Sequence, residues 1–263
     1  MSTSNTMKTL SLFRIHGKKL VHKDDEYGSI IVIEKNKYFI LTFDMIYEQS
    51  KIIRASPMVP VHHYIRAMLM ALAFTPVNKV LVLGLGGGCL VRAVNAYNNE
   101  AAMDVVELRA AVLSIGYEYF SLPVNALTHY YVQDANHFIN HENKSLYDII
   151  FSDLYSEDEM SPLQSKGSFL VSCADRLTLN GWLVMNYHIR PDASSVFSHA
   201  LHELFKTVLY CTTHSGNVVI YASKMDYPFP LSKFQELGTS IGEILNCEVR
   251  SLAEKISFWP KLI

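Results

Sequence analysis

Hydrophobic and polar positions divide the chain into two parts with different patterns. Apolar and polar residues alternate between residues 20 and 50, where two β-rich runs flank a short Lys-Asn-Lys turn. This alternation predicts an antiparallel hairpin or small sheet. Beyond two prolines, apolar residues recur at helical spacing over residues 62–74. We therefore expect a small N-terminal β domain over residues 1–58 and a larger domain over residues 59–263.

Strand-like and helix-like segments alternate through the larger domain. We expect parallel strands at Lys79–Leu83, Met103–Glu107, His129–Val132, Tyr147–Asp153 and Gly181–Tyr187. Residues 205–211 and 217–222 form two more strands, which must pair antiparallel because the five residues between them are too few for a crossover helix. The fold class is therefore α/β: a doubly wound, mostly parallel, seven-stranded Rossmann-like sheet that ends in an antiparallel hairpin. Residues 225–263 follow as a helical appendage.

A glycine-rich turn follows the first strand of this sheet. Residues 80–88, Val-Leu-Val-Leu-Gly-Leu-Gly-Gly-Gly, end a buried strand and precede a helical pattern. A strand that turns so tightly into a helix leaves backbone N–H groups and the positive helix end beside a bound ligand. Glycine is needed because a Cβ would block the turn or the ligand. We predict that Gly84, Gly86 and Gly88 belong to a cofactor site.

Three carboxylates follow at the ends of the next three strands. Glu107 comes 23 residues after Gly84, where a carboxylate can accept hydrogen bonds from both hydroxyls of a ribose. Asp134 closes the third strand, in position to accept from an adenine amino group, and Asp153 closes the fourth. Each acid taken alone is explained more simply as a polar cap at a strand end. Their order behind the glycine turn favours a nucleoside-binding site.

Composition and charge exclude several classes of partner. The 263 residues carry a net charge of −2 and are 49% hydrophobic, so we expect a folded protein with no nucleic-acid partner. No apolar run is long enough for a membrane span or a signal peptide, and the four cysteines form no C-x-x-C pair. We therefore expect a cytoplasmic protein without a membrane partner. His137 and His141 have the spacing of metal ligands on a helix, but no third ligand is near, so we expect no metal.

Together these segments resemble the spermidine synthases, which are polyamine aminopropyltransferases with the fold of class I S-adenosylmethionine-dependent methyltransferases. The resemblance rests on V-L-V-L-G-L-G-G-G, D-V-V-E-L-R-A-A-V-L-S-I-G-Y-E-Y-F, V-Q-D-A, Y-D-I-I-F-S-D-L-Y followed by M-S-P, and G-W-L-V-M-N-Y. The N-terminal L-T-F-D and the helix with Y-I-R-A-M are also similar to that family. The likeness therefore covers most of residues 20–224.

The resemblance implies that an aminopropyl group is moved from decarboxylated S-adenosylmethionine to a small-molecule amine acceptor. It implies that Asp153 orients the attacking amine and receives its proton. The acidic residues 157–159 are placed to attract a cationic substrate, although a solvated loop explains them equally well. The other implied site residues are Glu107 at the ribose, Asp134 and Ala135 at the adenine, and Tyr64 at the acceptor. Tyr155 follows a strand end, where it can pack on a substrate, although ordinary packing at the rim explains it equally well.

Several positions depart from the family pattern. Gly87 stands where active members carry an aspartate that contacts the aminopropyl amine, and Ser156 stands in place of the second acid of a D-S-S-D motif. A count without gaps from Asp44 places Glu48 where the family has a cofactor-contacting glutamine, and Gln49 is one residue off. The cofactor half of the pattern is thus better preserved than the amine half.

Two alternative functions stay open on the sequence alone. One is a methyltransferase that uses intact S-adenosylmethionine, because the lack of an aspartate at Gly87 would leave room for the methionine carboxylate. The other is a non-catalytic relative that binds a nucleoside, because features of the substrate site are missing. The exposed edge of the N-terminal hairpin is a plausible contact for a homodimer.

Overall fold

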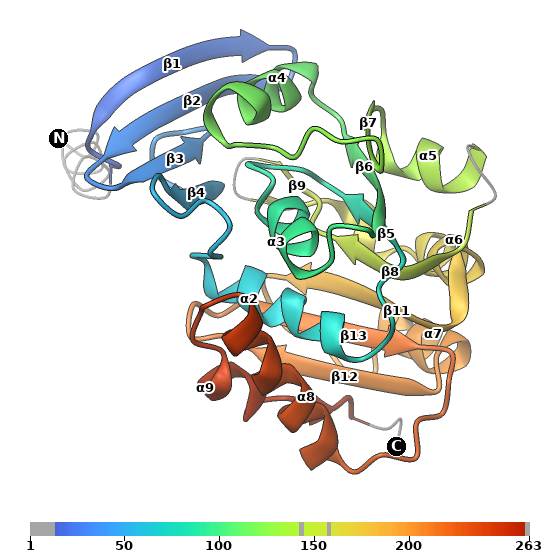
Figure 1. Cartoon of the computed structure of the whole chain (residues 1–263). Coiled ribbons are helices and arrows are strands. Elements are labelled where there is room, and N and C mark those ends of the chain that lie inside the picture. Colours follow the sequence, from blue (N-terminus) through green and yellow to red (C-terminus); the bar gives the residue numbers. More distant parts are fainter. Residues whose placement is uncertain (1–13, 142–144, 157–158, 261–263) are drawn as a thin grey trace, which may run out of the picture.

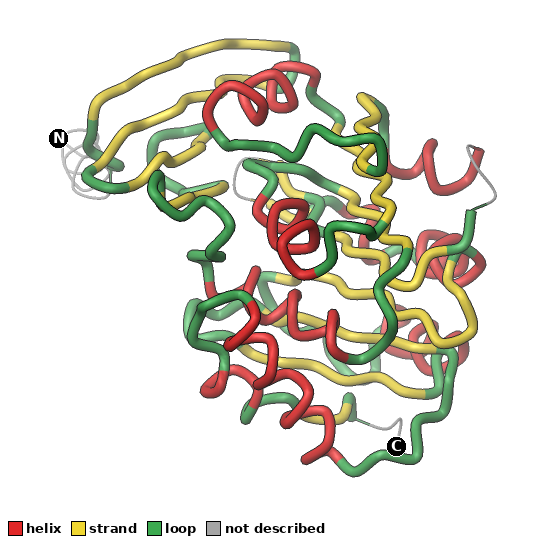
Figure 2. The backbone as a smooth tube through the Cα atoms, in the orientation of Figure 1, coloured by secondary structure: helices red, strands yellow, loops and turns green. Residues whose placement is uncertain are grey.

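The computed structural model describes residues 14–141, 145–156 and 159–260, and its two main sheets are flanked by helices (Figure 1). The N-terminal sheet has the order β1-β2-β3-β4, and each neighbouring pair is antiparallel. Figure 2 shows these strands as a layer apart from the larger sheet. Strand β1 is an edge of this layer. The homodimer contact that we expect at this edge stays a prediction. The strands are β1 (Lys18–Asp25), β2 (Gly28–Lys35), β3 (Tyr38–Thr42) and β4 (Ser50–Ile53).

The larger sheet has the strand order β14-β12-β13-β11-β8-β5-β6-β7. The five strands from β11 to β7 are parallel, and β13, β12 and β14 pair antiparallel at the other end. The expected fold is therefore confirmed, with an eighth strand, β14, beyond the seven that the sequence predicts. The strands are β5 (Lys79–Leu83), β6 (Ala102–Glu107), β7 (Thr128–Val132), β8 (Tyr147–Ser152), β11 (Leu177–Tyr187), β12 (Thr207–Thr212), β13 (Val218–Ser223) and β14 (Ser257–Phe258).

Helices cover both faces of the larger sheet. Alternate residues of each strand point to opposite faces, so each strand contributes side chains to both cores. Val80 and Val82 of β5 pack in the core beneath α2, α3, α4, α8 and α9, whereas Leu81 and Leu83 pack beneath α5, α6 and α7. In the described part of the chain, no helix combines the length and the apolar character needed to cross a bilayer. The helices are α2 (His63–Leu69), α3 (Cys89–Tyr97), α4 (Ala110–Tyr119), α5 (Ala135–His141), α6 (Gly167–Asp175), α7 (Val196–Leu204), α8 (Leu231–Ile244) and α9 (Arg250–Ala253).

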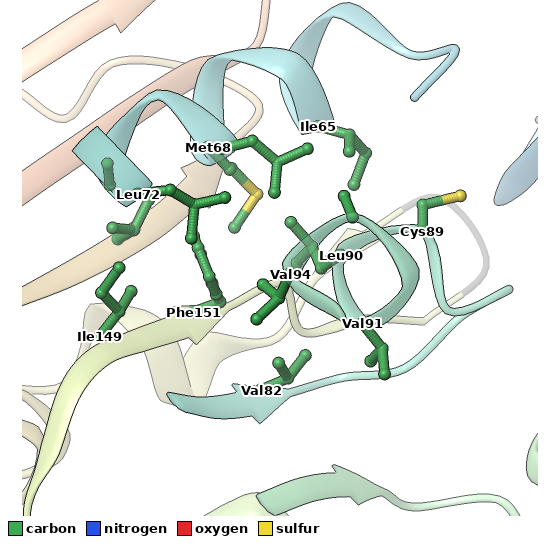
Figure 3. Packing of buried hydrophobic residues seen from close by; sticks show 14 of the residues in the cluster. Ile65, Met68, Leu72, Val82, Cys89, Leu90, Val91, Val94, Ile149 and Phe151 are labelled. Carbon is green, nitrogen blue, oxygen red and sulfur yellow. The ribbon is translucent and has the colours of Figure 1, made fainter. Parts of the chain in front are cut away.

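The core beneath the glycine turn fixes where that turn lies. Figure 3 shows Ile65 and Met68 of α2 facing Leu90 and Val94 of α3, with Phe151 of β8 beside them. All five side chains are buried. Each large apolar side chain buried in this way stabilises the fold by about 1.5–3 kcal/mol. The helix that follows the turn is therefore anchored against both the preceding helix and the sheet.

The C-terminal segment belongs to this core and is more than an appendage. Helix α8 passes so close to residues 70–73 that a Cβ on Gly238 would lie 3.0 Å from the Met70 sulfur. Ile241 of the same helix is fully buried. Beyond α9, the chain adds β14 to the sheet edge beside β12. The segment therefore covers sheet surface that would otherwise be exposed.

We expect Ile241→Ala to lower the free energy of unfolding by about 2–5 kcal/mol, because it leaves a cavity in a packed core. Ile244→Ala is the matched control, since Ile244 lies on the same helix but is 54% exposed, and it should change stability by less than about 0.5 kcal/mol. Urea denaturation of the two variants measures both values. Equal stabilities would show that α8 is not part of the core.

Candidate active site

A cavity of about 810 Å³ lies at the carboxyl ends of β5, β6, β7, β8 and β11. Residues of the N-terminal sheet and its loops line one side, and the first turn of α2 lines another. The predicted site residues that line it are Gly84, Gly86, Glu107, Asp134, Ala135, Asp153, Tyr64 and Tyr155. The structure thus brings together all but one of the residues that the sequence assigned to the site.

The exception is Gly88, which is not among the residues that line the cavity. Gly84 and Gly86 line the cavity with φ of +91° and +51°, and a Cβ on Gly84 would lie 2.3 Å from the Asp153 carbonyl oxygen. Gly88 has φ of +71° and begins α3, and a Cβ there would lie 2.1 Å from a methyl group of Leu122. Its glycine is explained by this left-handed turn and close packing. The predicted cofactor contact of Gly88 stays a prediction.

Glu107, the last residue of β6, is held against the cavity wall by backbone groups. Its carboxylate accepts hydrogen bonds from the N–H of Leu85 in the glycine turn, at 3.1 Å, and from the N–H of Arg109, at 2.9 Å. Burial raises the pKa of Glu107, and these hydrogen bonds act in the opposite direction. Each carboxylate oxygen has two lone pairs, so the fixed group keeps the capacity to accept from a diol.

Asp134 caps a helix and also lines the cavity. Its Oδ1 accepts a hydrogen bond from the His137 N–H at 2.9 Å, which caps the first turn of α5. The same side chain lines the cavity, as does the neighbouring Ala135. The cap fixes the orientation of the carboxylate, because one oxygen is held while the group faces the cavity.

Asp153 follows β8 directly, and two side chains hold its carboxylate. The Asn186 Nδ2 group donates to Oδ1 at 2.9 Å, and the Tyr64 hydroxyl is hydrogen bonded to the same carboxylate. Burial raises the pKa of Asp153 to about 6, although both hydrogen bonds act in the opposite direction. The Asn217 amide in turn donates to the Asn186 oxygen at 3.2 Å. A carboxyl group with a pKa this close to neutrality can exchange a proton with a substrate at physiological pH.

Sequence reasoning missed Asn186 and Asn217, although both line the cavity. Asn186 is the second-last residue of β11, so the strand-end rule that identified the three acids would also have found it. Tyr155, which was expected at the substrate, donates its hydroxyl to the Asn186 carbonyl at 3.0 Å. Its ring packs against His188, with 4.6 Å between the ring centroids. This pair forms an aromatic wall beside Asp153.

The N-terminal sheet forms the wall opposite the strand ends, and Arg109 attaches it there. The Arg109 guanidinium donates to both carboxylate oxygens of Asp25, at 3.0 and 2.8 Å, and to the Gly28 carbonyl at 2.8 Å. It also lies 4.7 Å from the centroid of the Phe43 ring, in cation–π contact. Because Arg109 is buried, these contacts are shielded from solvent. The cavity therefore has a fixed wall from each sheet.

The structure shows what surrounds Gly87 and Glu159, two of the positions discussed for substrate binding. A Cβ on Gly87 would lie 2.5 Å from the Ser50 hydroxyl and 2.9 Å from the Phe120 ring, so packed side chains fill the space beside this residue. This removes the argument that a missing aspartate leaves room for a methionine carboxylate. Glu157 and Asp158 lie outside the described residues, and Glu159 is exposed and does not line the cavity. Among the residues described, no group of three or more His, Cys, Asp or Glu side chains is placed to hold a metal ion.

Comparison with known proteins supports the resemblance seen in the sequence, although no protein-family model matches the chain. A polyamine aminopropyltransferase from Vibrio vulnificus strain CMCP6 is 26% identical over 267 residues, which cover 97% of this chain and 87% of the relative. A probable spermidine synthase from Corynebacterium glutamicum ATCC 13032 has a TM-score of 0.75 at 18% identity, over 94% of this chain and 91% of that one. A spermidine synthase in complex with the transition-state analogue AdoDATO has a TM-score of 0.63 at 15% identity, over 87% and 88%. The suspected resemblance and the fold are confirmed.

We expect Gly84→Ala to be more destabilising than Gly216→Ala. Both residues have positive φ, which costs about 1–2 kcal/mol for a residue with a Cβ. Only Gly84 also meets backbone atoms, whereas no atom lies within 4 Å of a Cβ on Gly216. The overpacking should add about 1–3 kcal/mol for Gly84→Ala in urea denaturation. Equal losses for the two variants would contradict the close approach to Asp153.

Proposed function

We propose that this chain is a transferase of the polyamine aminopropyltransferase type, which moves an aminopropyl group from decarboxylated S-adenosylmethionine to a small amine. The observation that carries this proposal is the half-buried Asp153 carboxylate, held by Asn186 in a cavity that it shares with Glu107 and Asp134. The polyamine aminopropyltransferase from Vibrio vulnificus aligns over 97% of this chain, which supports the same reaction. The analogue bound to a similar spermidine synthase supports an S-adenosylmethionine-related ligand.

The nucleoside is bound at the glycine turn and the ends of β6 and β7. Glu107, already fixed by backbone N–H groups, accepts hydrogen bonds from the two ribose hydroxyls. Asp134 accepts from the adenine amino group beside Ala135, and the bare backbone of Gly84 and Gly86 allows the ligand to approach closely. These contacts leave the sulfonium side chain free to extend toward Asp153.

The reaction is a displacement at the carbon bonded to the positively charged sulfur. The lone pair of the acceptor nitrogen forms the new C–N bond, the C–S bond breaks, and its electron pair stays on sulfur, so that neutral methylthioadenosine leaves. A free alkylamine has a pKa of about 10.4 and is protonated at neutral pH. The Asp153 carboxylate accepts a hydrogen bond from the ammonium and takes up the proton that must leave nitrogen. Holding nitrogen, carbon and sulfur in line supplies most of the acceleration.

Asn186 and Tyr64 fit the role of orienting this carboxylate. Both donate to Asp153, so their hydrogen bonds fix the direction of its remaining lone pairs. Burial raises the pKa of Asp153 to about 6, yet the group is still mostly ionised at pH 7. It is therefore a stronger base than an exposed aspartate while it remains ready to accept a proton.

Asp153→Asn should lower kcat at least about 100-fold, because it removes the proton acceptor of the reaction. Its affinity for methylthioadenosine should not change measurably, since that nucleoside is held by other residues. Glu159→Gln is the matched control, as Glu159 is exposed and does not line the cavity. Steady-state kinetics and isothermal titration calorimetry measure both properties. Full activity of Asp153→Asn would remove this residue from its proposed role.

The pH dependence of the wild-type enzyme should reflect the raised pKa of Asp153. Below about pH 6, kcat/KM should fall tenfold per pH unit as the carboxylate becomes protonated. The folded state holds this proton more tightly than the unfolded chain, whose pKa is near 3.8, so stability is lost as pH rises from about 4 to 6. Asp153→Asn should lack that loss and melt at a higher temperature than wild type at pH 7. Identical Tm-versus-pH curves for the two proteins would contradict the assignment.

A further inference from the structure

We propose that Glu48 binds the ammonium group at the end of the aminopropyl chain and so selects the decarboxylated form of S-adenosylmethionine. This inference rests on the proposed function and adds a residue that determines specificity. Decarboxylated S-adenosylmethionine carries two positive charges, one on sulfur and one on this terminal ammonium. A buried ammonium needs an anionic or hydrogen-bonding partner, because desolvation without one is costly. The proposal identifies that partner within the cavity.

Four carboxylates line the cavity among the described residues, and the proposed function already gives three of them a ligand contact. Glu107 is bound to backbone N–H groups of the glycine turn, and Asp134 caps α5, so both lie at the nucleoside end. Asp153 is bound to Asn186 and lies at the acceptor end. Glu48 is the fourth, and it enters the cavity from the N-terminal sheet. Since it has no other assigned ligand contact, we assign Glu48 to the cofactor side chain, which it would bind beside its own partner Lys51.

The position of Glu48 lies between these two ends. Two residues further on, the Ser50 hydroxyl packs against Gly87 and lies 3.1 Å from the Cys89 sulfur, which places this segment beside the glycine turn. On its other side, Glu48 lies near His62. Burial lowers the pKa of His62 to about 4, and the negative charge of Glu48 opposes this change. The His62 ring stacks on Tyr64, the partner of Asp153, with 5.7 Å between the centroids. Glu48 therefore shares one cavity wall with His62 and Tyr64, between the segment at the glycine turn and the partner of Asp153.

Lys51 holds the Glu48 carboxylate in place without using its full capacity. The Lys51 ammonium donates to both carboxylate oxygens at 3.0 Å. A carboxylate has about four acceptor positions, so a second ammonium can be bound beside the first. Intact S-adenosylmethionine would bring its own carboxylate to the same place, where Glu48 repels it and Lys51 attracts it, so selection requires Glu48 to lie nearer the ligand than Lys51 does. The charge of Glu48 therefore favours the ligand that lacks the carboxylate.

The test compares two thioether nucleosides that differ in the terminal ammonium, 5′-(3-aminopropylthio)adenosine and methylthioadenosine. In wild type the aminopropyl compound should bind more tightly, and Glu48→Gln should weaken it about ten- to a hundredfold. The same variant should leave methylthioadenosine affinity unchanged, which also shows that the protein is folded. Glu34→Gln is the matched control, because Glu34 is paired with Arg54 in the same sheet and does not line the cavity. Isothermal titration calorimetry measures all these affinities.

An equal effect of Glu48→Gln on both nucleosides, or no effect on either, would overturn the inference and leave the proposed function intact. Failure of wild type to bind either nucleoside would instead contradict the proposed function itself. Wild type should also prefer decarboxylated over intact S-adenosylmethionine, and Glu48→Gln should narrow that gap. If wild type binds both forms equally and Lys51→Met weakens only the intact form, Glu48 and Lys51 together recognise an amino acid, and the inference is wrong.

Discussion

The close approach of two backbone segments at Gly84 is the constraint on which the rest of the structure depends. With φ of +91° and no side chain, Gly84 lets the chain leave β5 directly against the segment that follows β8. The Gly84 N–H donates to the Val106 carbonyl, and the Asp153 N–H donates to the Leu83 carbonyl, both at 2.9 Å. These bonds keep β5, β6 and β8 aligned to their last residues. The carboxyl groups that follow the strands therefore meet at one edge of the sheet.

The N-terminal sheet adds a second wall at that edge and so forms the cavity. Arg109 connects the end of β6 to the turn between β1 and β2 through Asp25 and Gly28, and this attachment is buried. The attached sheet adds Glu48 to a cavity whose other acids come from the large sheet. In the proposed complex a doubly cationic ligand would lie among carboxylates from both layers, where partial desolvation would strengthen each attraction. The raised pKa of Asp153 has the same cause, because the enclosure that strengthens binding also makes its charged form less stable.

Much of this arrangement could be predicted from the sequence, because buried parallel strands are continuous apolar runs and the three acids directly follow such runs. The rest depends on contacts between distant segments. Strand β14 has two residues and is therefore too short to show the alternation of apolar and polar residues that predicts a strand. The amphipathic pattern of α8 predicts a helix with one buried face, but it does not indicate which surface that face covers. The sequence does not show that Gly86 lines the cavity whereas Gly88 begins α3. Glycine is favoured both where the backbone adopts a positive φ before a helix and where a ligand approaches the backbone closely. Asn217 and Glu48 acquire their roles only through partners in other elements, which a pattern within one segment does not show.

The central claim is that one cavity binds an adenosylated sulfur compound between Glu107, Asp134 and Asp153. A crystal structure of the protein with methylthioadenosine tests this most directly. The account predicts ribose hydroxyls within hydrogen-bonding distance of Glu107, the adenine amino group at Asp134, and the methylthio group directed toward Asp153. A nucleoside bound outside this cavity, or with its adenine at Asp153, would contradict the account.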